Sequence, residues 1–327
     1  MINIIYYVKI TLNYLSIKVI MMLWILLPSV LFGIVLGAND VANVFGPLTA
    51  NGVLKYKKAI IFSSISVILG ALLQGKAGTA TIGTLAPLND LTGSISLLTA
   101  TIVVTFVNFL KIPVSTTQAI VGSIIGSAVF SSISLNIGKL QIIIISWILT
   151  PALSFIFGIL FSKIFSLIFS HIKHIVTQNF LIKILSWIFL LYGAYSLGAN
   201  NLGNIVGVLN KKFDFSILAL IGGISISIGT IFFSKRATYN IGKKLIALTE
   251  FTAFLVVISA TMTVWIYAMI GIPVSFSQSI LGAMLGVSFA NGMKAINKKV
   301  ISKLVFTWVG TPTISFIISF FMNFLIN

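Results

Sequence analysis

The chain has 327 residues, of which 58% are hydrophobic and only 8% are charged, and its mean hydropathy is +1.14. A soluble chain of this length could not bury so much apolar surface in one core and still cover itself with polar groups. The net charge of +17 would suit nucleic acid, but the lysines stand singly or in short groups between apolar segments, as they do beside membrane helices. Composition therefore predicts a multi-pass protein of the cell membrane, with the lipid bilayer and no nucleic acid as a partner.

Apolar segments long enough to cross a bilayer, about 20 residues each, follow one another along the chain. Residues 1–20 form either an interfacial helix or an extra span, and both alternatives stay open. After them we expect ten spans, at 21–38, 58–75, 92–112, 114–131, 140–162, 182–198, 214–234, 245–270, 274–291 and 304–326. The segments at 114–131 and 274–291 are short enough to be re-entrant hairpins instead. The predicted fold class is an all-α polytopic membrane protein.

Two short motifs occur twice. The first, which we call the amide motif, reads GANDVAN at 37–43 and returns as GANNLGN at 198–204, 161 residues later. The second, the hydroxyl motif, reads PVSTTQ at 113–118 and returns as PVSFSQ at 273–278, 160 residues later. Two motifs that recur in one order with nearly one offset indicate that the chain is a duplicated module.

A third block supports the duplication, because Trp147 and Pro151 return as Trp308 and Pro312, again 161 residues later. The predicted organisation is the N-terminal segment at 1–20, a first repeat at 21–165, a basic cytoplasmic linker at 166–181 and a second repeat at 182–327. A duplicated membrane protein with a purely structural role is the plainer alternative.

Five spans in each repeat, an odd number, would make the second repeat enter the membrane in the opposite direction. The basic residues support this inversion, because 15 of the 21 lysine and arginine residues fall in loops that would then share the cytoplasmic side. These loops are 55–58, 111, 163–183, 235–244 and 294–303. Both termini would then lie outside. Inverted repeats with interrupted helices at the bilayer midplane are a common plan of secondary transporters.

The amide motif is the candidate cation site. Asp40 follows an apolar helix, and a carboxylate inside a membrane costs several kcal/mol unless a cation or hydrogen-bond donors compensate it. We expect the helix to break at Gly37 and again near Gly46 and Pro47, and to free carbonyl groups there. The oxygen-rich site would take Na+ or a proton. Its predicted ligands are Asn39, Asp40, Asn43, Asn200, Asn201 and Asn204. A tight crossing of helices joined by amide hydrogen bonds is the alternative.

The hydroxyl motif is the candidate anion site. Each copy begins a helix after a proline and then presents hydroxyl groups beside the free amide groups of the first turn, an arrangement that suits phosphate or sulfate. Ordinary N-capping by serine or threonine is the alternative. Two copies in inverted repeats could point two helix N-termini at one central place. The predicted ligands are Ser115, Thr116, Thr117, Gln118, Ser275, Ser277 and Gln278.

The other ionisable candidates favour structural roles. Asp90 reads as part of a helix cap and Asp214 as a residue at the membrane surface, whereas Glu250 lies about a turn inside a predicted span. His171 and His174, the only histidines, lie in a basic loop, so neither an enzyme nor a metal site is expected. No cofactor is expected apart from a coupling ion. An anion channel is a rival function, and the oligomeric state stays open, a homo-oligomer included.

With these residues the chain resembles the inorganic phosphate transporter family, often called PiT, from about residue 25 to the end. GANDVAN at 37–43 looks like the family signature, and PVSTTQ at 113–118 resembles a second family block that usually ends in histidine. The chain is similar to the short prokaryotic members. The resemblance implies symport of phosphate with cations, Asp40 and the asparagines contributing to ion sites and the serine and threonine blocks to the anion site.

The chain also departs from the family pattern. Asn201 stands where the second signature usually has aspartate, Gln118 and Gln278 stand where histidine is usual, and Phe276 replaces a hydroxyl residue. Fewer carboxylates hold fewer cations, which favours coupling to fewer Na+ ions, to protons, or transport of another anion. The predicted function is therefore a secondary active transporter that imports inorganic phosphate with Na+ or H+ by alternating access at a midplane site. Sulfate, which a divergent branch of the family moves, is the alternative substrate.

Overall fold

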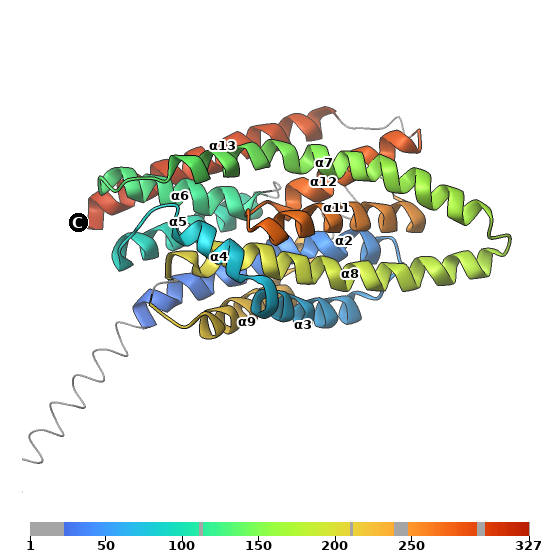
Figure 1. Cartoon of the computed structure of the whole chain (residues 1–327), viewed down its shortest axis with the longest axis horizontal. Coiled ribbons are helices and arrows are strands. Elements are labelled where there is room, and N and C mark those ends of the chain that lie inside the picture. The colour runs from blue at the N-terminus through green and yellow to red at the C-terminus, as the bar shows by residue number, and fades with distance from the viewer. Residues whose placement is uncertain (1–22, 111–113, 210–211, 239–247, 293–297, 327) are drawn as a thin grey trace, which may run out of the picture.

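The computed structural model describes residues 23–110, 114–209, 212–238, 248–292 and 298–326, and in the last range it describes side chains from 306 onwards. Within these ranges every regular element is a helix, as predicted. The segment 1–20, whose interfacial or spanning nature the sequence left open, lies outside the described residues. Figure 1 shows the helices as a bundle whose members run mostly along its long axis.

Among the described residues, eight helices are long and apolar enough to cross a membrane. The first, Leu23–Ala50, contains a π-helical turn η1 (Gly37–Val41) and then α2 (Ala42–Ala50). The other seven spans fall in α3 (Tyr56–Gln74), α5 (Asp90–Phe109), α7 (Ile137–Ser170), α8 (Ile175–Val206), α9 (Phe215–Phe233), α11 (Glu250–Ile270) and α13 (Lys298–Ile326). A short helix α4 (Lys76–Gly83) continues α3, and the 3-10 turn η2 (Gly207–Leu209) ends α8.

The two remaining predicted spans are short helices, α6 (Thr116–Phe130) and α12 (Phe276–Ala290). Each has 15 residues, which at about 1.5 Å per residue is too short for a hydrocarbon core of about 30 Å. Among the described residues each predicted repeat thus has four long spans and one helix of 15 residues, which fits the hairpin alternative. Both short helices begin near the middle of the bundle and run toward opposite ends (Figure 1).

The prediction that the helix breaks at the amide motif is wrong. The helix passes from Leu23 to Ala50 without interruption, with Pro47 inside it, and only widens into the π-turn at Gly37–Val41. In the second copy α8 passes straight through 198–204. The motif is surrounded by packed helices and can stay helical, and a π-bulge is the usual way to accommodate an irregular turn inside a helix near a functional site.

The helices that carry the amide motif pack against helices of the other predicted repeat. A Cβ atom added to Gly37 would lie 1.9 Å from the carbonyl oxygen of Ile226 in α9, and one added to Gly198 would lie 2.1 Å from that of Val67 in α3. Only glycine permits such an approach of two backbones. Gly198 lies 161 residues after Gly37 and Ile226 lies 159 residues after Val67, close to the offset of the motifs, so the same packing is made twice.

The short helices repeat this exchange at the other side of the bundle. Gly122 of α6 lies against Pro312 of α13, and Gly282 of α12 lies against Pro151 of α7, where an added Cβ would be 2.3 and 2.2 Å from the proline carbonyl oxygens. Each short helix therefore rests on the last long helix of the other repeat. The two repeats are interlocked rather than packed side by side.

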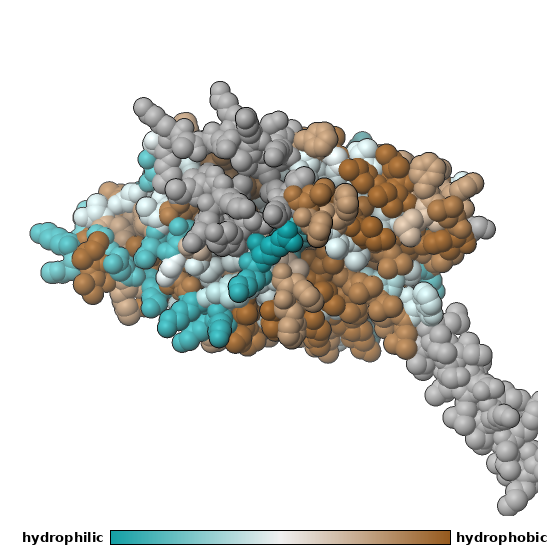
Figure 2. Space-filling model, turned by 180° about the vertical axis from the view of Figure 1, so that it is seen from behind, coloured by the Kyte–Doolittle hydropathy of each residue, from teal (hydrophilic) through white to brown (hydrophobic). Residues whose placement is uncertain are grey.

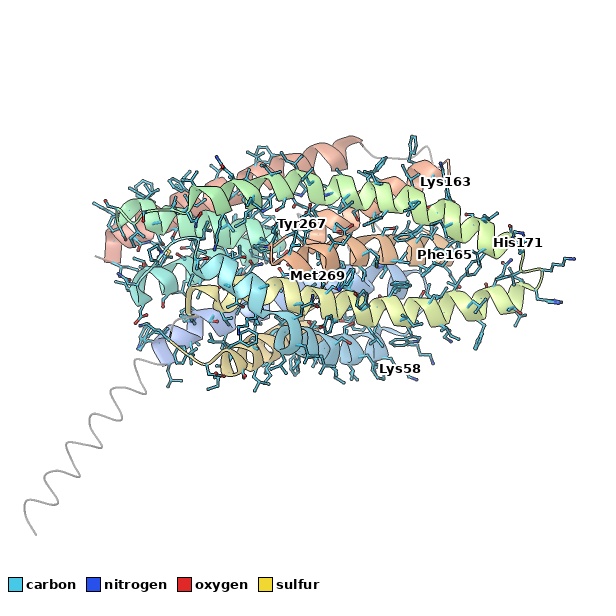
Figure 3. The ribbon with its side chains drawn as sticks, in the orientation of Figure 1. Lys58, Lys163, Phe165, His171, Tyr267 and Met269 are labelled. Atoms are coloured by element: carbon cyan, nitrogen blue, oxygen red, sulfur yellow. The ribbon has the colours of Figure 1, made fainter. Side chains whose placement is uncertain are left out.

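The two ends of the bundle differ in charge. The helix that begins at Leu23 and the end of α13 lie at one end (Figure 1), whereas Lys58, Lys163 and His171 lie toward the other (Figure 3). Hydrophilic residues gather at this second end, and a broad hydrophobic surface covers much of the rest of the face that Figure 2 shows. Large apolar side chains such as Ile148 are exposed on the long helices, as expected where helices meet lipid.

Candidate functional site

The two short helices begin with the same cap. The Ser115 side chain accepts a hydrogen bond of 3.3 Å from the Gln118 backbone N–H, and the Ser275 side chain accepts one of the same length from Gln278. The alternative of ordinary N-capping is thus correct for these two serines. The residues that follow, Thr116, Thr117 and Ser277, place their hydroxyl groups among the side chains of the amide motif.

Among the hydrogen bonds between the predicted repeats at the centre, two are equivalent to each other. Asn43 on α2 donates from Nδ2 to Ser277 Oγ over 2.8 Å, and Asn204 on α8 donates from Nδ2 to Thr117 Oγ1 over 2.9 Å. Asn43 and Asn204 are equivalent positions of the two amide motifs, and Thr117 and Ser277 are equivalent positions of the two hydroxyl motifs. Each amide motif is therefore bonded to the hydroxyl motif of the other repeat.

Asn39 and Asn200, a second equivalent pair, hold the chain just before each short helix. Asn39 donates from Nδ2 to the Val114 carbonyl oxygen over 3.1 Å. Asn200 donates to the Ile272 carbonyl oxygen and accepts from the Val274 N–H, both over 2.9 Å. These bonds fix where α6 and α12 start relative to the amide motifs.

The Asp40 carboxylate is fully buried and accepts hydrogen bonds from three neutral side chains. Thr116 donates to Oδ2, Asn39 donates to Oδ1 over 2.6 Å, and Ser277 donates to Oδ1 over 3.3 Å. Donors thus come from both hydroxyl motifs. Because none of these groups carries a positive charge, a cation or a proton is needed to offset the carboxylate at this depth.

Asn201 occupies the equivalent place in the second repeat but builds a neutral cluster. Its Oδ1 accepts from Asn204 over 2.8 Å and from Thr117 over 3.4 Å, and its Nδ2 donates to the Leu197 carbonyl oxygen over 3.3 Å. Phe276 stands at the position equivalent to Thr116, so it offers no hydroxyl group to Asn201. The scaffold is repeated here, but the charge is not.

All thirteen residues predicted as cation or anion ligands are buried, with exposed fractions between 0% and 6%. The sequence suggested two sets of ligands, and the structure joins members of both sets in two places. One hydrogen-bonded cluster contains Asp40, Asn39, Asn43, Thr116 and Ser277. The other contains Asn201, Asn204 and Thr117. The glutamines stand apart from both clusters. Neither amide atom of the Gln278 side chain, nor Gln118 Oε1, has a hydrogen-bond partner. Buried polar atoms of this kind are costly, about 1–3 kcal/mol each, unless a polar ligand meets them.

Several other buried polar side chains were not among the predicted ligands, and two of them lie near the prolines of α7 and α13. Trp147 Nε1 and Thr311 Oγ1 also lack a hydrogen-bond partner. Both lie within one turn of the prolines, Pro151 and Pro312, that contact the short helices. In the sequence Trp147 stands out only because it recurs, four residues before a proline, as Trp308 before Pro312. This recurrence is the one sequence feature that could have pointed to a buried indole N–H at this position.

Asp90 and Asp214 have the structural roles that the sequence favours. Asn89 caps α5 by accepting from Thr92 N over 2.9 Å, and the neighbouring Asp90 forms a solvent-exposed ion pair with Lys212. Asp214 caps α9 through Ser216 N. Glu250 is the first residue of α11. No cluster of metal-ligating side chains occurs in the described part of the chain.

Comparison with known proteins identifies the family to which the chain belongs. The model of the phosphate transporter family matches residues 36–319. A protein of Methanocaldococcus jannaschii designated as a candidate phosphate permease is 31% identical over 88% of this chain and 92% of its own length. The sulfate permease CysP of Bacillus subtilis is 28% identical over 90% of this chain and 85% of its own length.

A solved structure titled "The sodium-dependent phosphate transporter" superimposes with a TM-score of 0.80, covering 93% of this chain and 99% of that one at 20% identity. At this identity the likeness concerns the fold. The family match spans both amide motifs from position 37 onwards and both hydroxyl motifs, and so covers every predicted site residue. The chain is a multi-pass membrane protein that belongs to the phosphate transporter family, and it is a transporter rather than an enzyme.

Proposed function

We propose that this protein imports inorganic phosphate by symport with Na+ or H+, through alternating access at a single site between two inverted repeats. The repeats are 21–165 and 182–327, joined by the linker at 166–181 on the cytoplasmic side. The observation that carries the proposal is the central cluster, in which two helix N-termini with hydroxyl groups meet one buried carboxylate. Helix N-termini attract oxyanions, and the carboxylate and amide oxygens attract the cation.

The assignment of roles follows the contacts. Asp40 with Asn39 and Asn43 on one side, and Asn200, Asn201 and Asn204 on the other, supply oxygen ligands for the cation. Ser115, Thr116, Thr117 and Gln118, with Ser275, Ser277 and Gln278, surround the two helix N-termini and take the oxyanion. Thr116 and Ser277 contact Asp40 directly, so ion and anion would bind within reach of each other.

Burial of the cluster favours alternating access over a channel. Since none of the thirteen residues is more than 6% exposed, an anion reaches the site only after helices move. An open pore would leave several of these polar side chains accessible from both sides. The interlocked packing, in which each short helix rests on a helix of the other repeat, supports a motion of packed units that contain helices of both repeats.

Cation coupling follows from the membrane potential. Moving a charge against an inside-negative potential costs about 2.3 kcal/mol per charge per 100 mV, so an uncoupled phosphate ion would tend to leave the cell. A cation bound at Asp40 offsets part of the anion's charge and also the charge of the buried carboxylate. One carboxylate instead of two favours fewer coupled cations.

Sulfate is the second candidate substrate. The similarity to the sulfate permease of Bacillus subtilis and the neutral second half of the site, Asn201 with Phe276, both favour it. Sulfate has the tetrahedral geometry of phosphate but carries no proton at neutral pH. Gln278, whose amide has both a free donor and a free acceptor, is the residue best placed to distinguish a protonated oxyanion from an unprotonated one.

The experiment is uptake of labelled phosphate and labelled sulfate into proteoliposomes, with a Na+ gradient and a pH gradient imposed separately. The proposal predicts accumulation of phosphate under one gradient and none without either. Accumulation of sulfate alone would show that sulfate is the substrate and would leave the proposed mechanism unchanged. If neither anion accumulates under either gradient, the proposal fails.

A further inference from the structure

A cavity of about 550 Å³ lies away from the central site, at the end of the bundle that carries the basic loops. It is bounded by the turn between α2 and α3, the first turns of α3 and one face of α8. Its lining residues are Gly52, Val53, Leu54, Lys55, Lys58, Phe62, Lys183, Trp187 and Leu191. Nothing in the proposed transport mechanism uses this cavity.

The cavity combines positive charge with an apolar wall. Lys55, Lys58 and Lys183 are exposed, and within the described residues none of them forms an ion pair. Below them Phe62 and Trp187 meet edge to face, with ring centroids 5.5 Å apart. Tryptophan beside lysine is typical of the level at which lipid headgroups meet the hydrocarbon region.

We propose that this cavity binds an anionic phospholipid, with the phosphodiester among Lys55, Lys58 and Lys183 and one acyl chain along Phe62 and Trp187. Basic pockets between membrane helices suit such headgroups. A free oxyanion would use the three lysines but would gain nothing from the aromatic wall. The lipid would bridge the α2–α3 turn of the first repeat and α8 of the second. The helix that ends at this turn and α8 each carry one amide motif.

The site is accessible for such a ligand. Lys183 lies two turns inside α8, which begins at Ile175, and Lys55 and Lys58 flank the start of α3 at Tyr56. The cavity is thus lined by the first turns of α3 and by a part of α8 that starts about two turns after the beginning of that helix. Phe62 is 47% exposed, so its ring is available to an acyl chain.

The test measures lipid retained by the purified full-length protein with native mass spectrometry, after exchange into phosphatidylglycerol or phosphatidylcholine with the same acyl chains. The variant is K55Q/K58Q/K183Q. The matched control is K57Q/K163Q/K173Q, which removes the same charge from exposed lysines that do not line the cavity. A third sample contains phosphatidylglycerol together with millimolar inorganic phosphate.

The wild type and the control should retain phosphatidylglycerol in preference to phosphatidylcholine, and the cavity variant should bind it at least about tenfold more weakly. Equal retention by the cavity variant and the control would overturn the proposal. So would displacement of the lipid by millimolar inorganic phosphate, which would make the cavity a site for the free anion. If the triple variant does not fold, Lys183→Gln with Lys163→Gln as its control decides the same question. The readout needs no transport, so it is independent of the proposed function.

Discussion

The two halves of the central site share a scaffold and differ in charge. In both, an asparagine of the amide motif donates to a hydroxyl group of the other repeat, Asn43 to Ser277 and Asn204 to Thr117. Only the first half has a carboxylate, Asp40, and only that half receives a hydroxyl group, from Thr116, within the same repeat. The repeated bonds therefore belong to the shared scaffold, and the unequal charge is the reason for proposing that a cation binds beside Asp40.

The largest expected effect comes from the charged half. Asp40→Asn keeps the shape but loses the charge-assisted hydrogen bonds from Thr116 and Ser277, each worth about 1.5–3 kcal/mol. Gradient-driven uptake in proteoliposomes should fall by at least about tenfold, since 1.4 kcal/mol is a factor of ten. The matched change Asn201→Ala should cost less than Asp40→Asn. Unchanged uptake in the Asp40→Asn protein would refute the role given to this residue.

Adding a methyl group at the glycine contacts between the repeats should lower thermal stability equally in the two halves. Gly37→Ala and Gly198→Ala each place a methyl group about 2 Å from a carbonyl oxygen of the other repeat. Overpacking of this kind costs about 1–3 kcal/mol, so both variants should unfold at lower temperature in detergent. Gly310→Ala is the control, because its Cβ would find no atom closer than 4.0 Å and α13 would gain helix propensity. Destabilisation by Gly310→Ala to the same extent would contradict this account.

The cross-repeat hydrogen bonds should show a smaller, unequal effect. Asn43→Ala frees Ser277, which also donates to Asp40, whereas Asn204→Ala frees Thr117, whose partners are neutral. Losing one such bond costs about 1 kcal/mol in either half. In the concentration dependence of uptake on the coupling cation, only the Asn43 variant should shift the half-saturating concentration clearly. Equal shifts would mean that the cation is not held on the Asp40 side.

The smallest effect on uptake is expected when a carboxylate is added to the neutral half. Asn201→Asp, alone or with Phe276→Thr to supply the missing hydroxyl group, gives the second half the residue types of the first. The double variant should increase the steepness with which uptake depends on the cation concentration. Asn201→Asp alone should be less active, because its carboxylate would lack the donor that Asp40 has in Thr116. The opposite order of the two variants would show that the phenylalanine is not the missing partner.

Much of this arrangement could be predicted from the sequence. Duplication, helical class, the short helices at 114–131 and 274–291, and a central meeting of the two motifs all follow from apolar length and motif spacing. The helix break at Gly37 and Pro47 was predicted wrongly, because glycine and proline also serve close packing and a π-turn inside a continuous helix. Composition alone does not separate these uses.

The partners within the site were beyond sequence reasoning. The residues around Asn43 and Asn204 in the sequence do not indicate that each donates to the hydroxyl motif of the other repeat. The partners are 234 and 87 residues away along the chain. Such contacts depend on how the helices of the two repeats exchange positions in the bundle. The unpaired amide of Gln278 and the indole N–H of Trp147 likewise become visible only when their surroundings are known.

The central claim is that one closed site opens to one side of the membrane at a time. The chain has no cysteine, so Ser275→Cys or Ser115→Cys introduces a single thiol at the start of a short helix. In oriented proteoliposomes, a membrane-impermeant thiol reagent should label this thiol from one side only, and adding oxyanion with the coupling cation should change the rate on that side. Simultaneous labelling from both sides at equal rates, unaffected by substrate, would contradict alternating access and indicate a channel.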